Sequence, residues 1–368
     1  MPVVLEKLML MNPSPQLGST ALFLAGRLTY TVDDAIASAV FRGVLDAAVA
    51  ETLALAAAEK RAAEQDVEVG SDALQASSES FRHEHDLISA GETEEWLESR
   101  GMTADDFSGW LYQRLCRELN GFTDRSTKEL AIPARFPDLL RVHLWLSGQM
   151  NELGEQLSRR VAADLEISRR GETVSSEPVM EDFLQRHRLD ERALSGWLAA
   201  LGRDRSWLAE TVRIEAAFNR LISMALTKEA RADQLASMQL SLARIEVETL
   251  DVDSEAAARE AFLCVRDDGV TLSEMALETG YRAERAQIWL DLLDDPVGQR
   301  LLSAAEGEVI GPIERDGRFK VYQVLRKLKP TMTDPAVAHR LDERIVDEFF
   351  STLCARHIRA KDIARIAK

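Results

Sequence analysis

The chain has 368 residues, of which 46% are hydrophobic and 29% charged, a composition typical of folded globular proteins rather than disordered ones. Its 62 acidic and 45 basic residues give a formal net charge of -17, which would repel a phosphate backbone and excludes nucleic acid as the expected partner. No apolar run reaches the ~18 residues of a membrane-spanning helix. The three cysteines, Cys116, Cys264 and Cys354, lack metal-ligand or redox spacing, so we expect neither a metal nor a cofactor.

The first residues, MPVVLEKLMLMNPSPQLG, lack the pattern of a secretory signal peptide. Glu6 and Lys7 interrupt the first apolar patch, and Pro13 and Pro15 break the run that follows. We therefore expect these residues to belong to the mature chain and the protein to be cytoplasmic.

Two short strands and a long helix are expected next. The stretch LFLAGRLTYT has extended, apolar residues on both sides of Gly26, which indicates two strands joined by a turn. The pattern from Thr31 to Gln65 then predicts one helix, and Thr31 and Asp34 have the spacing of a capping box. These elements begin a chain in which helical patterns dominate.

A pair of motifs recurs about 100 residues apart in the middle of the chain. The motif F-x3-H-x-L begins at Phe81 and at Phe183, and W-L-x3-G begins at Trp96 and at Trp197. Two motifs in the same order with nearly the same spacing indicate a duplicated helical module.

The repeated histidines, His85 and His187, could be paired ligands or acid-base groups. Only His187 has carboxylates at helical spacing, in Asp190 and Glu191, so the repeat keeps the histidine without keeping a partner for it. We therefore predict that both histidines pack at helix ends.

The pattern changes after residue 240. SLARIEVETL alternates like a half-buried strand, and it is followed by a helix over about 254–265, a helix over 271–280 and a short helix in DPVGQRLLSAAEG. Two strands, in GEVIGPIE and GRFKVYQVLRKL, flank a turn at 315–317. The predicted order is β-α-α-α-β-β. A final helix over 335–360 follows, with an apolar stripe at helical spacing: Leu341, Ile345, Phe349 and Leu353.

The segment GEVIGPI at 307–313, with the strand after it, resembles the end of a parvulin-type peptidyl-prolyl isomerase domain. LSEMA at 272–276 is similar to a helix of that domain, and RGMTADDFSGWLYQRL is similar to a chaperone helix of SurA-like and PrsA-like foldases. The resemblance implies a mainly α fold, in which a duplicated SurA-like helical chaperone module accompanies a small α+β parvulin-like domain. It also implies a long C-terminal helix that packs back on the helical modules.

Four segments are expected on this basis. They are a strand pair with a first helical module over 1–130, a second, repeat-related module over 131–238, the α+β domain over 239–330 and the C-terminal helix over 331–368.

The isomerase domain is degenerate in this comparison. Arg244 and Lys320 stand where parvulins have their two catalytic histidines, and RAERAQIWLDLL replaces a glycine-rich stretch. An X-Pro amide twists over a barrier of ~18–20 kcal/mol, which an isomerase lowers with an apolar pocket and hydrogen-bonding groups. We therefore assign no catalytic residue. The candidate peptide-binding residues are Trp289, Val297, Leu301, Phe319, Arg244 and Lys320.

The leading hypothesis is a peptide-binding chaperone or scaffold that holds a precursor peptide for modifying enzymes and lacks isomerase activity. An alternative is an enzyme, with isomerase or new activity in a remodelled pocket around Trp289, Arg244 and Lys320. A second alternative is a structural subunit of a biosynthetic complex.

Overall fold

The computed structural model describes residues 15–119, 132–292, 296–315 and 317–360. Most of the predicted mature N-terminus and part of the turn at 315–317 lie outside this part of the chain. Two compact units are present, one formed by Met1–Ile222 with Phe349–Lys368 and the other by Ser223–Glu348. The expected mainly α class, with small antiparallel sheets, is confirmed.

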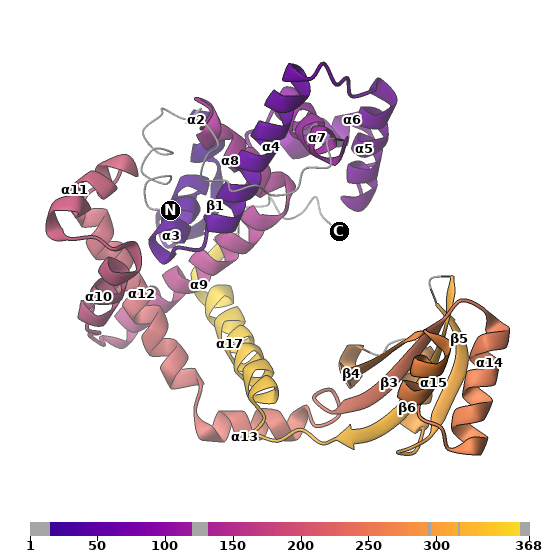
Figure 1. Ribbon diagram of the computed structural model, residues 1–368. Coiled ribbons are helices and arrows are strands. Elements are labelled where there is room, and N and C mark those ends of the chain that lie inside the picture. Colours follow the sequence, from indigo (N-terminus) through magenta and orange to yellow (C-terminus); the bar gives the residue numbers. More distant parts are fainter. Residues whose placement is uncertain (1–14, 120–131, 293–295, 316, 361–368) are drawn as a thin grey trace. The chain divides into compact units, whose positions relative to one another are not determined.

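The first unit consists of helices and one short sheet (Figure 1). Its elements are α2 Pro15–Ser19, β1 Ala21–Ala25, β2 Leu28–Thr31, α3 Val32–Arg42, α4 Asp46–Glu64, α5 Ser71–Glu84, α6 Ala90–Glu98, α7 Ala104–Leu119, α8 Phe136–Leu146, α9 Gln149–Arg170, α10 Glu177–His187, α11 Glu191–Ala200, α12 Arg205–Ala225 and β7 Ile358–Ala360. The strands are ordered β2-β1-β7, and all pairs are antiparallel.

The start of this unit agrees with the sequence in part. Both strands and the capping box of Thr31 with Asp34 are confirmed. The single helix over 31–65 is wrong, because α3 ends at Arg42 and α4 begins at Asp46. Gly43 ends α3 with a φ of 70°, a left-handed conformation that glycine adopts without a Cβ clash.

The two copies of the repeat have the same ring geometry. Each copy contains a Phe, a His and a Trp in mutual contact. The Phe–His centroid distances are 4.2 and 5.0 Å, the edge-on Phe–Trp distances 5.6 and 5.0 Å, and the His–Trp distances 5.5 and 5.4 Å. His85 is the C-cap of α5, and His187 is the last residue of α10. The predicted packing role at helix ends is therefore confirmed for both.

Backbone turns repeat as well. Asp86 and Arg188, which follow the two histidines, both have a φ of 54°, and Gly101 and Gly202 have φ values of 73° and 63°. The helices α5–α6–α7 and α10–α11–α12 are thus two copies of one three-helix motif. Side chains from both copies contribute to a single hydrophobic core, which extends from Leu17 to Val212.

The end of α17 (Pro335–His357) belongs to the first unit from Phe349 onward. Phe350 is fully buried against Phe218 of α12, with ring centroids 4.8 Å apart. The predicted helix over 335–360 is too long, because residues 358–360 form β7 and pair with β1. β7 has only three residues, which is too short for the alternating apolar pattern that predicts a strand.

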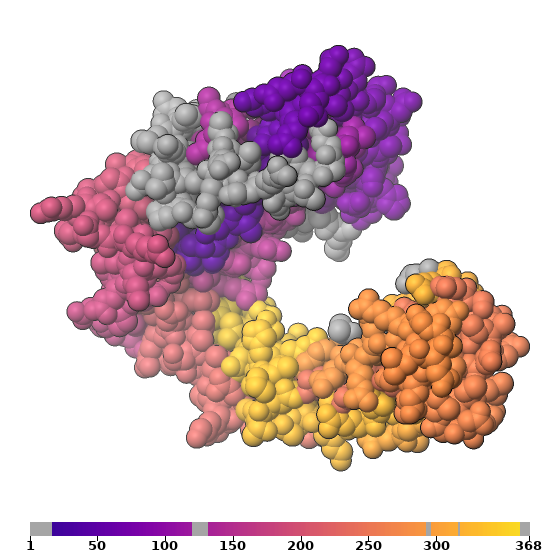
Figure 2. Space-filling model, viewed as in Figure 1, coloured from indigo at the N-terminus to yellow at the C-terminus, as the bar shows by residue number. Residues whose placement is uncertain are grey.

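The second unit is a four-stranded antiparallel sheet with helices. Its elements are α13 Lys228–Ser237, β3 Arg244–Val252, α14 Glu255–Leu263, a π-helical turn Cys264–Asp268, α15 Leu272–Thr279, β4 Arg282–Trp289, a 3-10 turn Leu290–Leu292, α16 Pro296–Ser303, β5 Val309–Arg315, β6 Arg318–Leu328 and the first part of α17. The strand order is β4-β3-β6-β5. The orange surface in Figure 2 belongs to this unit.

Helices cover both faces of this sheet. α14 and α15 pack over a core that includes Leu250 and Val321, and α16 packs over a core that includes Val247 and Tyr322. The predicted order β-α-α-α-β-β lacks β4 and is wrong there. This strand lies at the sheet edge and is largely exposed, so charged residues replace the apolar alternation that marks a strand.

Candidate functional site

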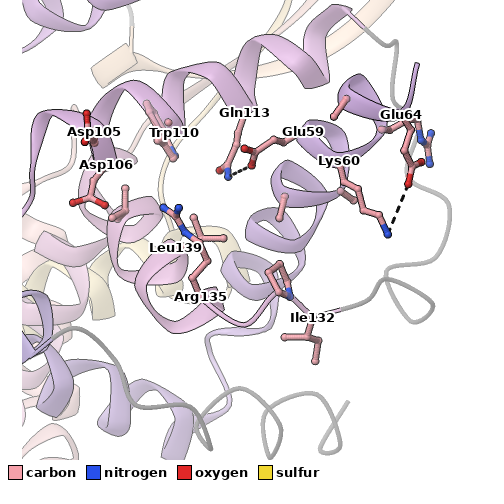
Figure 3. A pocket seen from close by; sticks show the side chains of 17 residues that line it. Glu59, Lys60, Glu64, Asp105, Asp106, Trp110, Gln113, Ile132, Arg135 and Leu139 are labelled. Atoms are coloured by element: carbon pink, nitrogen blue, oxygen red, sulfur yellow. Dashed lines mark hydrogen bonds and ion pairs between the residues drawn. The ribbon is translucent and has the colours of Figure 1, made fainter. Parts of the chain in front are cut away.

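A groove with a cavity volume of about 930 Å³ lies in the first unit, between α4, α7 and the residues around the start of α8 (Figure 3). Its apolar lining comes from all three elements. The larger apolar residues are Trp110, Ile132, Pro133, Leu139 and Val142. The volume falls within the range of roughly 300–1,000 Å³ that is usual for ligand sites.

Small residues on the two long helices leave this space open. α4 contributes Ala56, Ala57 and Ala63 to the wall, whose side chains end at Cβ. α7 contributes Gly109, where an added Cβ would meet no atom within 4 Å. The alanines of α4 therefore favour helix formation, and their short side chains leave space above this face of the helix.

Trp110 is held in place on the floor of the groove. Its side chain is largely buried, and its Nε1 donates a hydrogen bond to Nδ1 of His143 at 3.3 Å. Burial lowers the pKa of His143, so the ring is neutral and its Nδ1 can accept this bond. The guanidinium of Arg114 lies 4.9 Å from the indole centroid. A fixed aromatic ring of this kind is a suitable anchor surface for an apolar side chain.

Charged groups surround the apolar floor. Figure 3 places Asp105 and Asp106 at one end of the groove and Lys60 with Glu64 at the other. Asp106 accepts a hydrogen bond from the backbone N–H of Thr103 at 3.0 Å, which caps α7. These groups leave the ends of the groove polar while its floor stays apolar.

A second set of charged groups lies between these ends. Glu59 accepts a hydrogen bond from Gln113 at 2.7 Å. Arg135 lines the groove and has no ion-pair partner in the part of the chain that the structure describes. The arrangement offers apolar contact in the middle and charge at the rim, which suits an extended or helical peptide segment.

The six residues predicted to bind a peptide lie in the second unit at separate places. Trp289, at the end of β4, packs against Val337 and Leu341 of α17. The guanidinium of Arg244 lies 4.8 Å from its ring centroid and that of Arg340 lies 4.2 Å away. These two predicted residues, Trp289 and Arg244, are therefore neighbours.

Arg244 has its own polar partners. It forms an ion pair with Asp334 and donates a hydrogen bond to Gln287 at 2.8 Å. This pairing connects the start of β3 with the start of α17.

The other four residues lie elsewhere on the sheet. Val297 and Leu301 of α16 pack on one face, and Leu301 is 1% exposed. Phe319 packs on the opposite face, and Nζ of Lys320 lies 3.4 Å from a carboxylate oxygen of Asp251. Peptide binding by these six residues stays a prediction.

Strand register separates Arg244 and Lys320, the two residues predicted to replace catalytic histidines. Lys320 is opposite Asp251, whereas Arg244 is opposite Leu328 at the other end of the same strand pair. At ~3.3 Å per residue, the intervening length of β3 is roughly 23 Å. Lys320 therefore lies apart from Arg244 and Trp289, although the sequence grouped the three together.

The groove of the first unit was not predicted. A signal was present in the run of alanines in α4 and in a glycine next to a tryptophan in α7. The sequence does not show that these helices face each other, because that depends on tertiary packing.

Among the described residues, no group of three or more His, Cys, Asp or Glu side chains is placed to hold a metal ion. No helix in those same parts of the chain has the length and apolar character needed to cross a membrane.

Comparison with known proteins adds structural similarity without sequence similarity. No family profile matches the chain, and no curated protein sequence matches it. The solved structures that resemble it include PrsA from Bacillus subtilis, with 10% identity over 61% of this chain and 86% of that chain at a TM-score of 0.22. A structure of a SurA-like chaperone from Campylobacter jejuni has 11% identity over 59% of this chain and 87% of that chain, with a TM-score of 0.18. The foldase PrsA from Lactococcus lactis gives 11% over 95% and 100% at 0.24. Scores and identities this low do not transfer an activity.

Proposed function

We propose that this protein is a peptide-binding chaperone or scaffold, and that the groove between α4, α7 and α8 holds an apolar segment of its client. The observation that carries the proposal is the combination of an open apolar floor, a fixed tryptophan and charged ends in that groove. A binding site for a chain segment needs apolar contact along its length and polar groups where the segment leaves.

The client is proposed to be a precursor peptide with an apolar core and basic flanks. The net charge of -17 favours the approach of a basic segment. Figure 3 shows acidic side chains, Asp105 and Asp106, at the end of the groove where one such flank would leave. The proposed setting is the cytoplasm, where the held peptide would be presented to modifying enzymes.

The sheet unit is proposed to lack isomerase activity. The two positions predicted to replace catalytic histidines carry an arginine and a lysine. Arg244 begins β3, whereas Lys320 lies on β6 opposite Asp251, near the other end of β3. A proline-isomerisation assay on a tetrapeptide should give the uncatalysed rate at any protein concentration. A rate that rises in proportion to protein would reject this part of the proposal.

A pair of glycine substitutions tests the groove. Gly109→Leu places a side chain into the open space of the groove, and Gly196→Leu does the same on α11, outside it. Both glycines are exposed and helical, and neither added Cβ would meet an atom within 4 Å. Both substitutions should therefore raise helix stability by a similar amount, about 0.5–1 kcal/mol.

Binding is measured by fluorescence anisotropy with synthetic peptides that have an apolar centre and basic flanks. The expected result is micromolar binding that Gly109→Leu weakens at least about tenfold and Gly196→Leu leaves unchanged. Equal binding by both variants would reject the groove as the site. If no peptide binds, including the peptides encoded by short reading frames beside the gene, the alternative of a structural subunit of a biosynthetic complex would be favoured.

A further inference from the structure

A second cavity of the first unit, with a volume of about 480 Å³, lies between the C-terminal end of α3 and the helices α9, α10 and α12. It shares no lining residue with the groove described above. Its apolar wall includes Val44, Pro178 and Val179. Three arginines and two carboxylates also line it: Arg42, Arg160, Arg186, Asp182 and Glu215.

Arg42 is buried and incompletely paired. Its side chain is 10% exposed. Nε donates to the carbonyl oxygen of Ser38 at 3.3 Å, and Nη1 donates to Oε1 of Gln156 at 2.5 Å. The buried Nη2 has no hydrogen-bond partner among the residues that the structure describes. A buried guanidinium donor without an acceptor is costly, typically by ~1–3 kcal/mol.

The carboxylates near Arg42 do not balance the arginines. Oε1 of Glu215 accepts a hydrogen bond from Nε of Arg160 at 2.6 Å and lies 3.8 Å from Nε of Arg42. Glu215 thus serves two guanidinium groups at once. Asp182 forms an ion pair with Arg186. One positive charge is left in excess within the described lining.

The ionisation of Arg42 agrees with this imbalance. Burial, and then repulsion by Arg160, lower its pKa to about 10. It stays protonated at neutral pH, so its positive charge is present and unfavourably placed. An anion beside Nη2 would relieve both the missing hydrogen bond and the repulsion.

We propose that this cavity binds a carboxylate carried on a short apolar group, with the carboxylate on Nη2 of Arg42 and the apolar group against Val44, Pro178 and Val179. A single negative charge matches the excess charge of the lining, and planar carboxylates suit the guanidinium fork. The ligand is either a free small acid or the C-terminal residue of a peptide. The inference does not depend on the α4–α7–α8 groove.

The first test compares N-acetyl-leucine with N-acetyl-leucinamide by calorimetric titration of the full chain. These two compounds differ only in the carboxylate, so the proposal expects saturable binding of the acid and binding of the amide that is at least about tenfold weaker. Equal binding of both, or no binding of the acid and of the tripeptide described next, would overturn it. N-acetyl-Ala-Ala-Leu separates the two sources, because tighter binding than N-acetyl-leucine identifies a peptide C-terminus and equal binding identifies a small acid.

Variants connect the binding to this cavity. Arg42→Gln should abolish binding of the acid. Since that substitution also disturbs a buried residue, Val44→Glu provides a second test at a position whose side chain is largely accessible, 50% exposed. The added carboxylate should repel the ligand and weaken binding at least about tenfold.

The matched control is Ile88→Glu, which adds the same charge at a residue that is 85% exposed and lines neither cavity. It should leave the affinity unchanged. Unchanged affinity in Val44→Glu, or an equal loss in Ile88→Glu, would overturn the assignment to this cavity.

Discussion

Glu166 offers the sharpest test of how the C-terminal helix is held in the first unit. Its carboxylate is 1% exposed on α9. Arg169 donates two hydrogen bonds to it, at 2.7 and 2.9 Å, and Arg170 donates one at 2.9 Å. From the end of α17, Nε2 of His357 lies 3.0 Å and Nη1 of Arg356 lies 3.3 Å from Oε2. One buried carboxylate therefore joins α9 to the last turn of α17.

Glu166→Gln keeps the shape of this side chain and removes its charge. In glutamine one of the two carboxylate oxygens becomes an NH₂ group, which is a hydrogen-bond donor. This group would face the side-chain donors of Arg169, Arg170, Arg356 or His357 and could not accept their hydrogen bonds. Charged hydrogen bonds contribute ~1.5–3 kcal/mol each. The side chains of Arg169 and Arg356 are 57% and 50% exposed, so solvent screening reduces the contribution of their hydrogen bonds. We expect a loss of about 2–4 kcal/mol.

The loss should be local as well as global. Hydrogen exchange of the amides in residues 353–360 should accelerate in Glu166→Gln more than exchange in α4. The control is Glu172→Gln, which alters a carboxylate 33% exposed that forms longer ion pairs, at 3.9 Å with Arg170 and 3.8 Å with Arg220. Exposed pairs contribute ~0–1 kcal/mol, so this control should change little.

The pH dependence gives a second readout of the same residue. Hydrogen bonds from Arg169, opposed by burial and assisted by His357 and Arg170, hold the pKa of Glu166 well below its usual value of 4.5. The unfolded chain therefore takes up the proton first, so this stabilisation is complete above about pH 5 and is lost as pH falls further. The difference between wild type and Glu166→Gln should shrink in that range. Equal stability of the two proteins at about pH 7 would refute the reasoning.

Three further changes have defined outcomes. Burial lowers the pKa of His187, so the unfolded chain binds more protons and stability should fall below about pH 6.5; His187→Gln should flatten this fall in urea titrations between about pH 7.5 and 5.5. Gly43→Ala should cost about 1–2 kcal/mol, because φ is 70° there, whereas Gly109→Ala should not destabilise the chain. Trp289→Ala should destabilise the second unit by about 2–4 kcal/mol in thermal unfolding, since the ring packs on α17, and an unchanged transition would contradict that packing.

Local sequence signals predicted local structure well. The cap at Thr31, the turn at Gly26 and the matched histidines follow from residues a few positions apart, and each is present in the structure. The repeat was readable because both copies keep the same aromatic residues. Those residues form the same ring cluster and so are constrained by packing.

Features that depend on tertiary structure were not predicted. A glycine inside an amphipathic pattern can be tolerated or can end the helix, and at Gly43 it ends the helix. β4 carries charged side chains because its edge is exposed, which removes the apolar alternation. Arg244 and Lys320 were grouped by comparison of positions, whereas strand register, which the sequence does not show, places them apart. The groove forms because α4 and α7 face each other, and its lining residues come from separate segments between positions 56 and 142 of the chain.

The most direct test of the central claim is hydrogen exchange of the full chain with and without a saturating peptide that has an apolar centre and basic flanks. We expect slower exchange in α4, α7 and the start of α8, with no change in α12, the helix that corresponds to α7 in the other copy of the repeat. Protection confined to the second unit, or protection of both repeats alike, would contradict the claim that the α4–α7–α8 groove holds the peptide.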